Sequence, residues 1–127
     1  MTRVAIVDDA LLIRMQLKKF FEEKMHFDVV AQGADGNDAV RIFSERKPDL
    51  MTLDLTMPNK SGVESIREIM QQFPEARILV VSAIKDSAMI TEALQLGAKG
   101  FINKPLQFAS EEFVGVLKEE IEEALKA

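Results

Sequence analysis

The chain alternates short apolar runs with longer stretches in which apolar residues recur every three or four positions. The runs VAIV, DVVA, LMTL, ILVV and GFI predict strands over residues 3–8, 28–32, 49–54, 77–82 and 99–103. Between and after them, i, i+3/i+4, i+7 spacing predicts five amphipathic helices. Their apolar stripes run through Ile13–Phe21, Ala39–Phe43, Val63–Phe73, Ile90–Leu94 and Val114–Ala124.

Capping and turn residues separate these segments. Asp35 and Asp86 suit helix N-caps, Gly97 suits a helix C-terminus, and every proline falls between predicted elements. No internal repeat, linker or low-complexity segment interrupts the pattern. Five strands that alternate with five helices predict one α/β domain over residues 1–127, a doubly wound parallel sheet with helices on both faces.

The character of each predicted strand indicates its place in the sheet. The first, third and fourth strands are continuously apolar, which is typical of strands buried on both faces. The second opens with Asp28, is weaker, and suits an edge. We therefore expect the flavodoxin-like strand order 2-1-3-4-5, in which the order reverses between strands one and three. Ligands of such sheets bind beyond the carboxyl ends of the strands beside that reversal.

Composition narrows the class of protein. With 16 basic and 21 acidic residues, a net charge of −5 and no basic run, nucleic-acid binding is not expected. The absence of cysteine excludes disulfides, thiolate metal sites and cysteine nucleophiles. There is no signal-peptide pattern and no apolar stretch of transmembrane length, so we expect a cytoplasmic protein without membrane contact.

Three aspartates fall at the ends of otherwise apolar strands. Asp8 and Asp9 follow VAIV, and Asp54 interrupts LMTLDL. The predicted order brings them together, where each pair repels by about 1–4 kcal/mol, depending on the local dielectric. Either one of them stays protonated or a cation neutralises the cluster, and a site of carboxylate oxygens suits Mg²⁺. The only histidine, His26, falls in a predicted surface loop away from these strand ends, so zinc or copper is not expected.

The ends of strands four and five add groups that bind anions. Strand four ends with the hydroxyl of Ser82, followed by the small Ala83, and strand five leads to Lys104. A hydroxyl, backbone N–H groups, an ammonium and a divalent cation around one carboxylate favour a phosphoryl group. A carboxylate can itself attack phosphorus, which makes Asp54 the candidate nucleophile.

Structural interpretations of the same residues stand beside this hypothesis. Asp8 and Asp9 could cap the following helix, and Asp54 with Lys104 could form a purely structural ion pair. The acidic final helix, SEEFVGVLKEEIEEAL, is interpreted as a solvated face around an apolar stripe, with a partner-binding surface as the alternative. Four methionines are predicted to fill the core: Met15, Met51, Met70 and Met89.

Four motifs together resemble the receiver domain of bacterial response regulators, the CheY-like family. They are VDD after strand one, LDLTMPNKSG around Asp54, SA after strand four and KP after strand five. The resemblance covers essentially the whole chain. It implies that Asp54 is the phosphoacceptor, which takes its phosphoryl group from a histidine of a separate sensor kinase. It also implies that Asp9, Asp54 and the backbone carbonyl of Thr56 bind Mg²⁺ directly, with Asp8 acting through water.

The resemblance assigns further roles around the phosphoryl group. Lys104 would contact this group, and backbone groups at Thr56 and Ala83 would bind its oxygens. After phosphorylation Ser82 would move toward it, and Phe101 would turn inward as the aromatic switch residue. The same metal and lysine would support spontaneous loss of the phosphate.

Two positions depart from the family pattern. Phe101 stands where tyrosine is common, so an output that needs a phenolic hydroxyl is not available. Asn103 is polar where an aliphatic residue is more usual, and we expect it on the output face. The resemblance further implies a cis peptide bond between Lys104 and Pro105.

Two other classes of protein fit the sequence less well. A flavodoxin-like electron carrier needs a phosphate loop rich in Ser, Thr and Gly after strand one, where this chain has DDALLIR. A haloacid-dehalogenase-type phosphatase carries its nucleophile in a D-x-D motif after strand one and has a cap insertion, and neither feature is found.

The expected function is a signalling switch that catalyses only its own phosphorylation and dephosphorylation. Because no output domain follows residue 127, we expect a stand-alone, monomeric regulator that acts by protein contact. The motifs most resemble chemotaxis-type regulators that bind the flagellar motor switch. A phosphorelay intermediate that passes the phosphoryl group to a histidine phosphotransfer protein is the alternative, as is the receiver domain of a longer regulator.

Overall fold

The computed structural model describes residues 1–127, and strands and helices alternate along the whole chain. The strands are β1 Arg3–Val7, β2 Asp28–Gly33, β3 Leu50–Leu53, β4 Ile78–Ser82 and β5 Gly100–Asn103. The helices are α1 Leu11–Glu23, α2 Gly36–Arg46, α3 Gly62–Gln72, α4 Ser87–Leu96 and α5 Glu111–Lys126. Every predicted element is present, and each strand end lies within one residue of its predicted position. None of the helices is both long and apolar enough to span a lipid bilayer.

The five strands form one parallel sheet in the order β2-β1-β3-β4-β5, which confirms the prediction. Its register aligns the strand ends that matter for chemistry. Val7 of β1 pairs with Leu53 of β3, so the residues after them, Asp8 and Asp54, leave the sheet at the same level. Ser82 of β4 pairs with Asn103 of β5, so Lys104, the next residue of the chain, follows the end of β5 beside Ser82.

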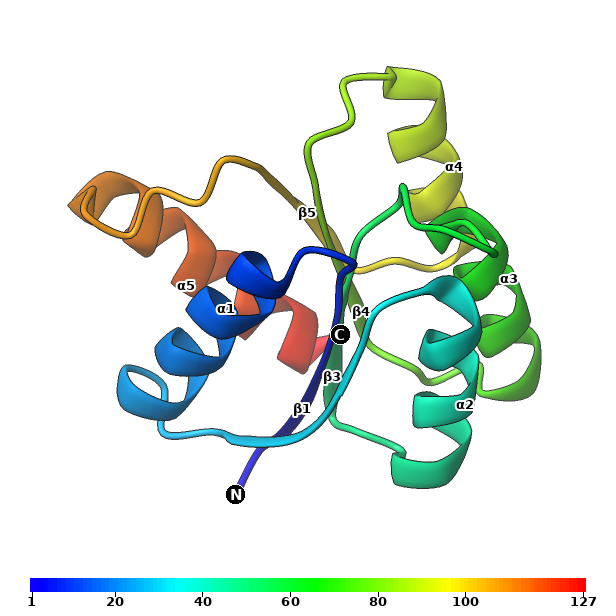
Figure 1. The fold of residues 1–127 in the computed structure, drawn as a ribbon, viewed down its shortest axis with the longest axis horizontal. Helices are drawn as coiled ribbons and strands as arrows, with labels where there is room; N and C mark the ends of the chain where they lie inside the picture. Colours follow the sequence, from blue (N-terminus) through cyan, green and yellow to red (C-terminus); the bar gives the residue numbers. More distant parts are fainter.

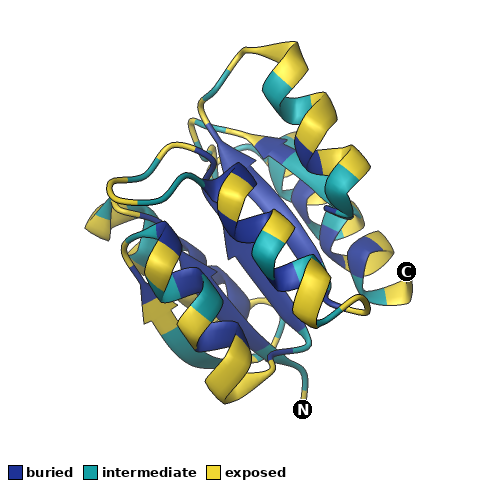
Figure 2. Ribbon diagram, turned by 90° about the vertical axis from the view of Figure 1, so that its right-hand side faces the viewer, coloured by how far each residue is buried: buried dark blue, intermediate teal, exposed yellow.

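Helices cover both faces of the sheet, with α1 and α5 on one face and α2, α3 and α4 on the other (Figure 1). Successive strand residues alternate between the two cores. Val4 and Ile6 pack on the α1/α5 side, whereas Ala5 and Val7 pack on the side of α2, α3 and α4. Figure 2 shows the central strands as buried along their length, as expected for a sheet covered on both sides.

The helix ends follow the predicted capping residues. Asp35 accepts a hydrogen bond from the N–H of Asp38 at the start of α2, and Asp86 accepts one from the N–H of Ala88 at the start of α4. Gly97 ends α4 with a φ of 126°, a conformation that side-chain-bearing residues rarely adopt. These three predictions are confirmed.

The prediction for the methionines is wrong at one position. Met51 is fully buried, and Met70 and Met89 pack partly buried against the core, but Met15 is 59% exposed. Met15 lies two residues before the buried Leu17, and on a helix that spacing places it near the opposite face of α1. His26 is exposed in the loop after α1, as predicted.

Candidate functional site

The three aspartates converge at the carboxyl ends of β1 and β3. Oxygens of Asp8, Asp9 and Asp54 lie within 4.8 Å of one another. Asp8 and Asp54 are buried, at 1% and 4% exposure, whereas Asp9 is exposed. The backbone N–H group of each buried residue forms a hydrogen bond with a carbonyl of the neighbouring strand. The N–H of Asp8 donates to the carbonyl of Gly33 at 3.0 Å, and that of Asp54 to the carbonyl of Val7 at 3.1 Å.

The two oxygens of Asp54 have different partners. Oδ1 accepts a hydrogen bond from the Ser82 hydroxyl at 2.7 Å and a longer one from the N–H of Thr56 at 3.4 Å. Oδ2 lies 3.3 Å from Nζ of Lys104, whose ammonium also lies 2.7 Å from Oδ2 of Asp8. One carboxylate therefore meets a hydroxyl, a backbone N–H and an ammonium group, the combination that the strand ends predicted.

The aspartates after β1 do not cap helix α1. The N-cap of α1 is Ala10, and its side chain accepts no hydrogen bond. Oδ1 of Asp8 accepts a bond from the N–H of Ala10 at 2.9 Å, which fixes the side chain of Asp8 rather than the first turn of the helix. The capping interpretation of Asp8 and Asp9 is thus wrong.

Burial and charge act against each other in the cluster. Burial raises the pKa of Asp8, and the nearby Asp54 raises it further, while Lys104 and the N–H of Ala10 oppose the shift. Burial also lowers the pKa of Lys104, but its contacts with Asp8 and Asp54 outweigh this effect and leave the pKa above its usual value. The protein therefore holds an ionised lysine beside carboxylates that are crowded and poorly hydrated.

The donor set fits a hard divalent cation. Three carboxylates face one ammonium group, which leaves an excess of negative charge. Oδ2 of Asp8 is buried, and although the ammonium of Lys104 is close, no donor reaches this oxygen with hydrogen-bond geometry. All side-chain ligands are oxygens, and Asp9 lies on the exposed side, where metal-bound water has room. These are the properties of a Mg²⁺ site.

The remaining candidate residues lie around this cluster. Ala83 follows β4 and is exposed, and the next residue, Ile84, donates its N–H to the Ser82 hydroxyl at 3.4 Å. Phe101 pairs with Val80 in the sheet and packs half-buried against the core under α2, α3 and α4, so it is not part of the carboxylate cluster. Asn103 is exposed at the end of β5. The peptide bond between Lys104 and Pro105 is cis.

Three residues that support the site were not identified from the sequence. A Cβ on Gly62 would lie 2.2 Å from the carbonyl oxygen of Asp54, so α3 begins directly against the backbone of the central aspartate. Arg14 donates from Nη1 to the carbonyl of Asp8 at 2.7 Å. Asn59 donates to Oδ2 of Asp35 at 2.8 Å and ties the β3–α3 loop to α2. Asn59 and Gly62 both lie in the segment LDLTMPNKSG, whereas nothing in the sequence singled out Arg14.

Comparisons with known proteins agree on one family. The sequence model of one protein family, the response regulator receiver domain, matches residues 4–115 of this chain. The chemotaxis protein CheY of Thermotoga maritima is 46% identical over 105 residues, which cover 83% of this chain and 87% of that protein.

Solved structures give the same result. The response regulator domain of Thermotoga maritima CheB has a TM-score of 0.86 and 37% identity, covering 100% of this chain and 98% of that one. A chain of the CheX-CheY-BeF3-Mg²⁺ complex from Borrelia burgdorferi has a TM-score of 0.85 and 32% identity, covering 95% and 87%. The first of these similarities covers the whole chain and so includes the strands and loops that carry the carboxylate cluster.

Proposed function

The chain belongs to the response regulator receiver domain family, and we propose that it is a phosphorylation-controlled switch of two-component signalling with Asp54 as the phosphoacceptor. The observation that carries the proposal is the surroundings of Asp54. Ser82 binds one of its carboxylate oxygens and Lys104 lies beside the other, with Asp8 and Asp9 adjacent. A structural ion pair alone would need neither the hydroxyl nor the two additional carboxylates.

The proposed reaction is a transfer between two side chains. A carboxylate oxygen of Asp54 attacks the phosphorus of a phosphohistidine on a sensor kinase, the N–P bond breaks, and the imidazole leaves with its electron pair. Lys104 offsets the negative charge that gathers at Asp54, where two anions meet. Mg²⁺, held by Asp9, Asp54 and the carbonyl of Thr56 with Asp8 acting through water, would supply further positive charge when bound.

Phosphorylation would then change the contacts of the neighbouring groups. We infer that the Ser82 hydroxyl, now bonded to Asp54, moves to a phosphoryl oxygen, and that N–H groups at Thr56 and Ala83 bind its other oxygens. The rearranged β4 end would allow Phe101 to turn inward and alter the surface around Asn103. A shift from 1:99 to 99:1 between two states requires about 5.5 kcal/mol of differential stabilisation, within reach of several charge-assisted hydrogen bonds.

The surface beside the site suits a protein phosphodonor. Leu11, Leu12 and Met15 are 61%, 64% and 59% exposed on the first turns of α1, directly after Asp9. Exposed apolar side chains in one place indicate protein contact. We propose that the kinase domain carrying the phosphohistidine packs on this patch while its imidazole reaches Asp54.

For the pathway we propose chemotaxis, with output through contact of the α4–β5–α5 face with a flagellar motor switch protein. The support is the 46% identity to a chemotaxis protein CheY and the likeness to a CheY solved with CheX. The protein would act in the cytoplasm as a monomer and catalyse only its own phosphorylation and dephosphorylation. A phosphorelay intermediate, or the receiver of a longer regulator, would share the site but contact a different partner.

A direct test uses a small phosphodonor. The purified protein is incubated with acetyl phosphate and Mg²⁺, and its intact mass is recorded, with Asp54→Asn as the matched control. We expect the wild-type protein to gain one phosphoryl group and EDTA to prevent this gain. No adduct on the wild-type protein, or an equal adduct on the control, would rule out Asp54 as the acceptor.

A further inference from the structure

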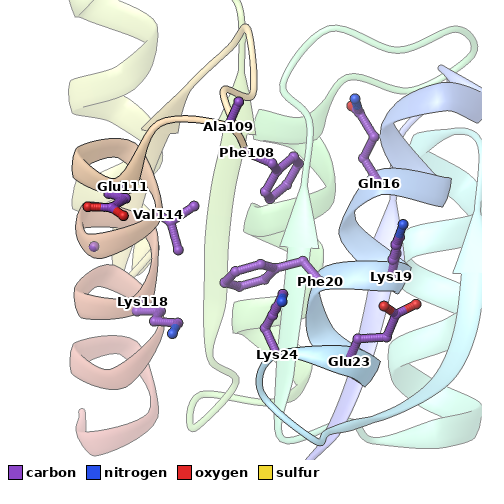
Figure 3. Close-up of a pocket in the computed structure, with 11 residues that line it drawn as sticks. Gln16, Lys19, Phe20, Glu23, Lys24, Phe108, Ala109, Glu111, Val114 and Lys118 are labelled. Carbon is purple, nitrogen blue, oxygen red and sulfur yellow. The ribbon is translucent and has the colours of Figure 1, made fainter.

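A second concave surface lies between α1 and α5, on the face of the sheet that these two helices cover (Figure 3). It is a groove of about 660 Å³, and none of its lining residues belongs to the carboxylate cluster. Its floor is aromatic. Phe20 and Phe108 line it with their rings 5.5 Å apart, and Phe113, which does not line the groove, packs edge-on against Phe108 at 5.9 Å. The floor is therefore apolar and held by ring-to-ring packing.

The groove is flanked by lysines that have no partner within the protein. Lys19 of α1, Lys24 at the C-cap of α1 and Lys118 of α5 line it, and none of them lies within ion-pair distance of a carboxylate. In Figure 3, Lys24 and Lys118 extend into the space from opposite walls. Glu23 and Glu111 also line the groove, so its lysines exceed its glutamates by one, and the carboxylate of Glu111 points away from the groove in the figure. On a chain with a net charge of −5, this groove carries a local excess of positive charge.

Gly115 has no role in the packing of the domain. It lies in the interior of α5 and lines the groove, and a Cβ built on it would meet nothing within 4 Å. Glycine is the poorest helix former after proline, because it loses the most backbone freedom on folding. Other glycines of this chain, such as Gly36 and Gly62, are required by close backbone contacts inside the molecule, and Gly115 is not. A missing side chain facing open space leaves room for another backbone to approach closely.

We propose that the groove between α1 and α5 docks an acidic amphipathic helix of a partner protein. The apolar side chains of that helix would pack on the partly exposed Phe108 and Val114, above the buried Phe20. Its glutamates or aspartates would meet Lys24 and Lys118 on the two walls, and its backbone would cross α5 at Gly115. This is the helix-in-groove mode of recognition, with charge complementarity selecting an acidic partner. The proposal does not depend on phosphorylation of Asp54.

The experiment measures the binding of two labelled peptides by fluorescence anisotropy. One is an acidic amphipathic helix with leucine on one face and glutamate on its flanks, and the other has lysine in place of every glutamate. We expect the acidic peptide to bind at least about tenfold more tightly, with affinity that falls as sodium chloride is added. Equal binding of the two peptides would overturn the proposal.

Three variants locate the site. Lys118→Glu is expected to weaken binding of the acidic peptide by at least about tenfold. Lys18→Glu makes the same charge change on an exposed α1 residue outside the groove, and should have a small effect. Gly115→Ala should raise the melting temperature, because the methyl group has room and favours the helix, and still weaken binding. A Lys118→Glu effect no larger than that of Lys18→Glu, or unchanged binding by Gly115→Ala, would contradict the docking geometry.

Self-association is measured on the same proteins by analytical ultracentrifugation. We expect the wild-type protein and Lys118→Glu to sediment alike at every concentration. A concentration-dependent dimer that Lys118→Glu abolishes and Lys18→Glu retains would show that the groove binds a second copy of this chain, and would overturn the assignment to a partner helix.

Discussion

Replacing Lys104 with methionine is expected to destabilise the protein strongly at neutral pH. Methionine keeps most of the length and apolar stem of the side chain but removes the ammonium. Asp8 and Asp54, both almost fully buried, would then lose the one ammonium that forms ion pairs with their carboxylates. Breaking a buried pair by removing one partner is costly because the remaining charge stays buried without compensation.

The magnitude follows from the two contacts. At an effective dielectric of about 20, the 2.7 Å contact with Asp8 and the 3.3 Å contact with Asp54 correspond to gross attractions of about 6 and 5 kcal/mol. Desolvation of the ammonium offsets much of this attraction, and loss of one partner of a buried pair costs about 3–5 kcal/mol in measured cases. Total stabilities are about 5–15 kcal/mol, so this loss would be readily measured.

The assay is urea unfolding at pH 7 in the presence of EDTA, followed by circular dichroism. The matched control is Lys60→Met, which removes the ion pair between Lys60 and the half-exposed Glu68 and should cost less than about 1 kcal/mol. The deficit of Lys104→Met should shrink as the pH falls, because burial raises the pKa of Asp8 and its protonated form no longer needs a counter-charge. A loss no larger than that of the control at pH 7 would refute the electrostatic account of the site.

Three further predictions concern other parts of the structure. Thr52→Val should raise the free energy of unfolding by about 1 kcal/mol, since the buried hydroxyl of Thr52 has no hydrogen-bond partner, and an unchanged urea midpoint would contradict this. Gly62→Ala should lower the free energy of unfolding by about 1–3 kcal/mol and slow labelling by acetyl phosphate, because its methyl group would press on the carbonyl of Asp54. Wild-type stability and labelling rate would refute that reading. Burial raises the pKa of Glu120, and Glu119 and Glu123 add to the shift, so stability is lost as the pH rises from the unfolded pKa of this carboxyl through its folded pKa. Glu120→Gln should therefore raise the melting temperature at pH 7 but not below pH 4.5, and equal gains at both pH values would count against it.

The fold was predictable because its strands are short and apolar on both faces. In β1, Val4 and Ile6 face one core and Ala5 and Val7 face the other, so every position from Val4 to Val7 is apolar. Such a continuous apolar run is the pattern expected of a strand buried on both faces. Helical spacing did not predict that apolar side chains in the first turns of α1 are exposed to solvent. Met15 is apolar but lies off the stripe of Leu17 and Phe21, and only the stripe is buried.

The site was predictable where chemistry is attached to strand ends. Asp8, Asp54, Ser82 and Lys104 each follow or end a strand, and the strand order alone brings them together. The support from Arg14 was not predictable, because it depends on where one long side chain of α1 points relative to the carbonyl of Asp8. The roles of these residues in phosphotransfer stay predictions.

The most direct test of the central claim locates the phosphoryl group chemically. The protein is labelled with acetyl phosphate and Mg²⁺, reduced with sodium borohydride, which converts an aspartyl phosphate to homoserine, and then digested and sequenced by mass spectrometry. We predict homoserine at position 54 and unmodified aspartate at positions 8 and 9. Homoserine at position 8 or 9, or at none of the three, would contradict the assignment of Asp54 as the phosphoacceptor.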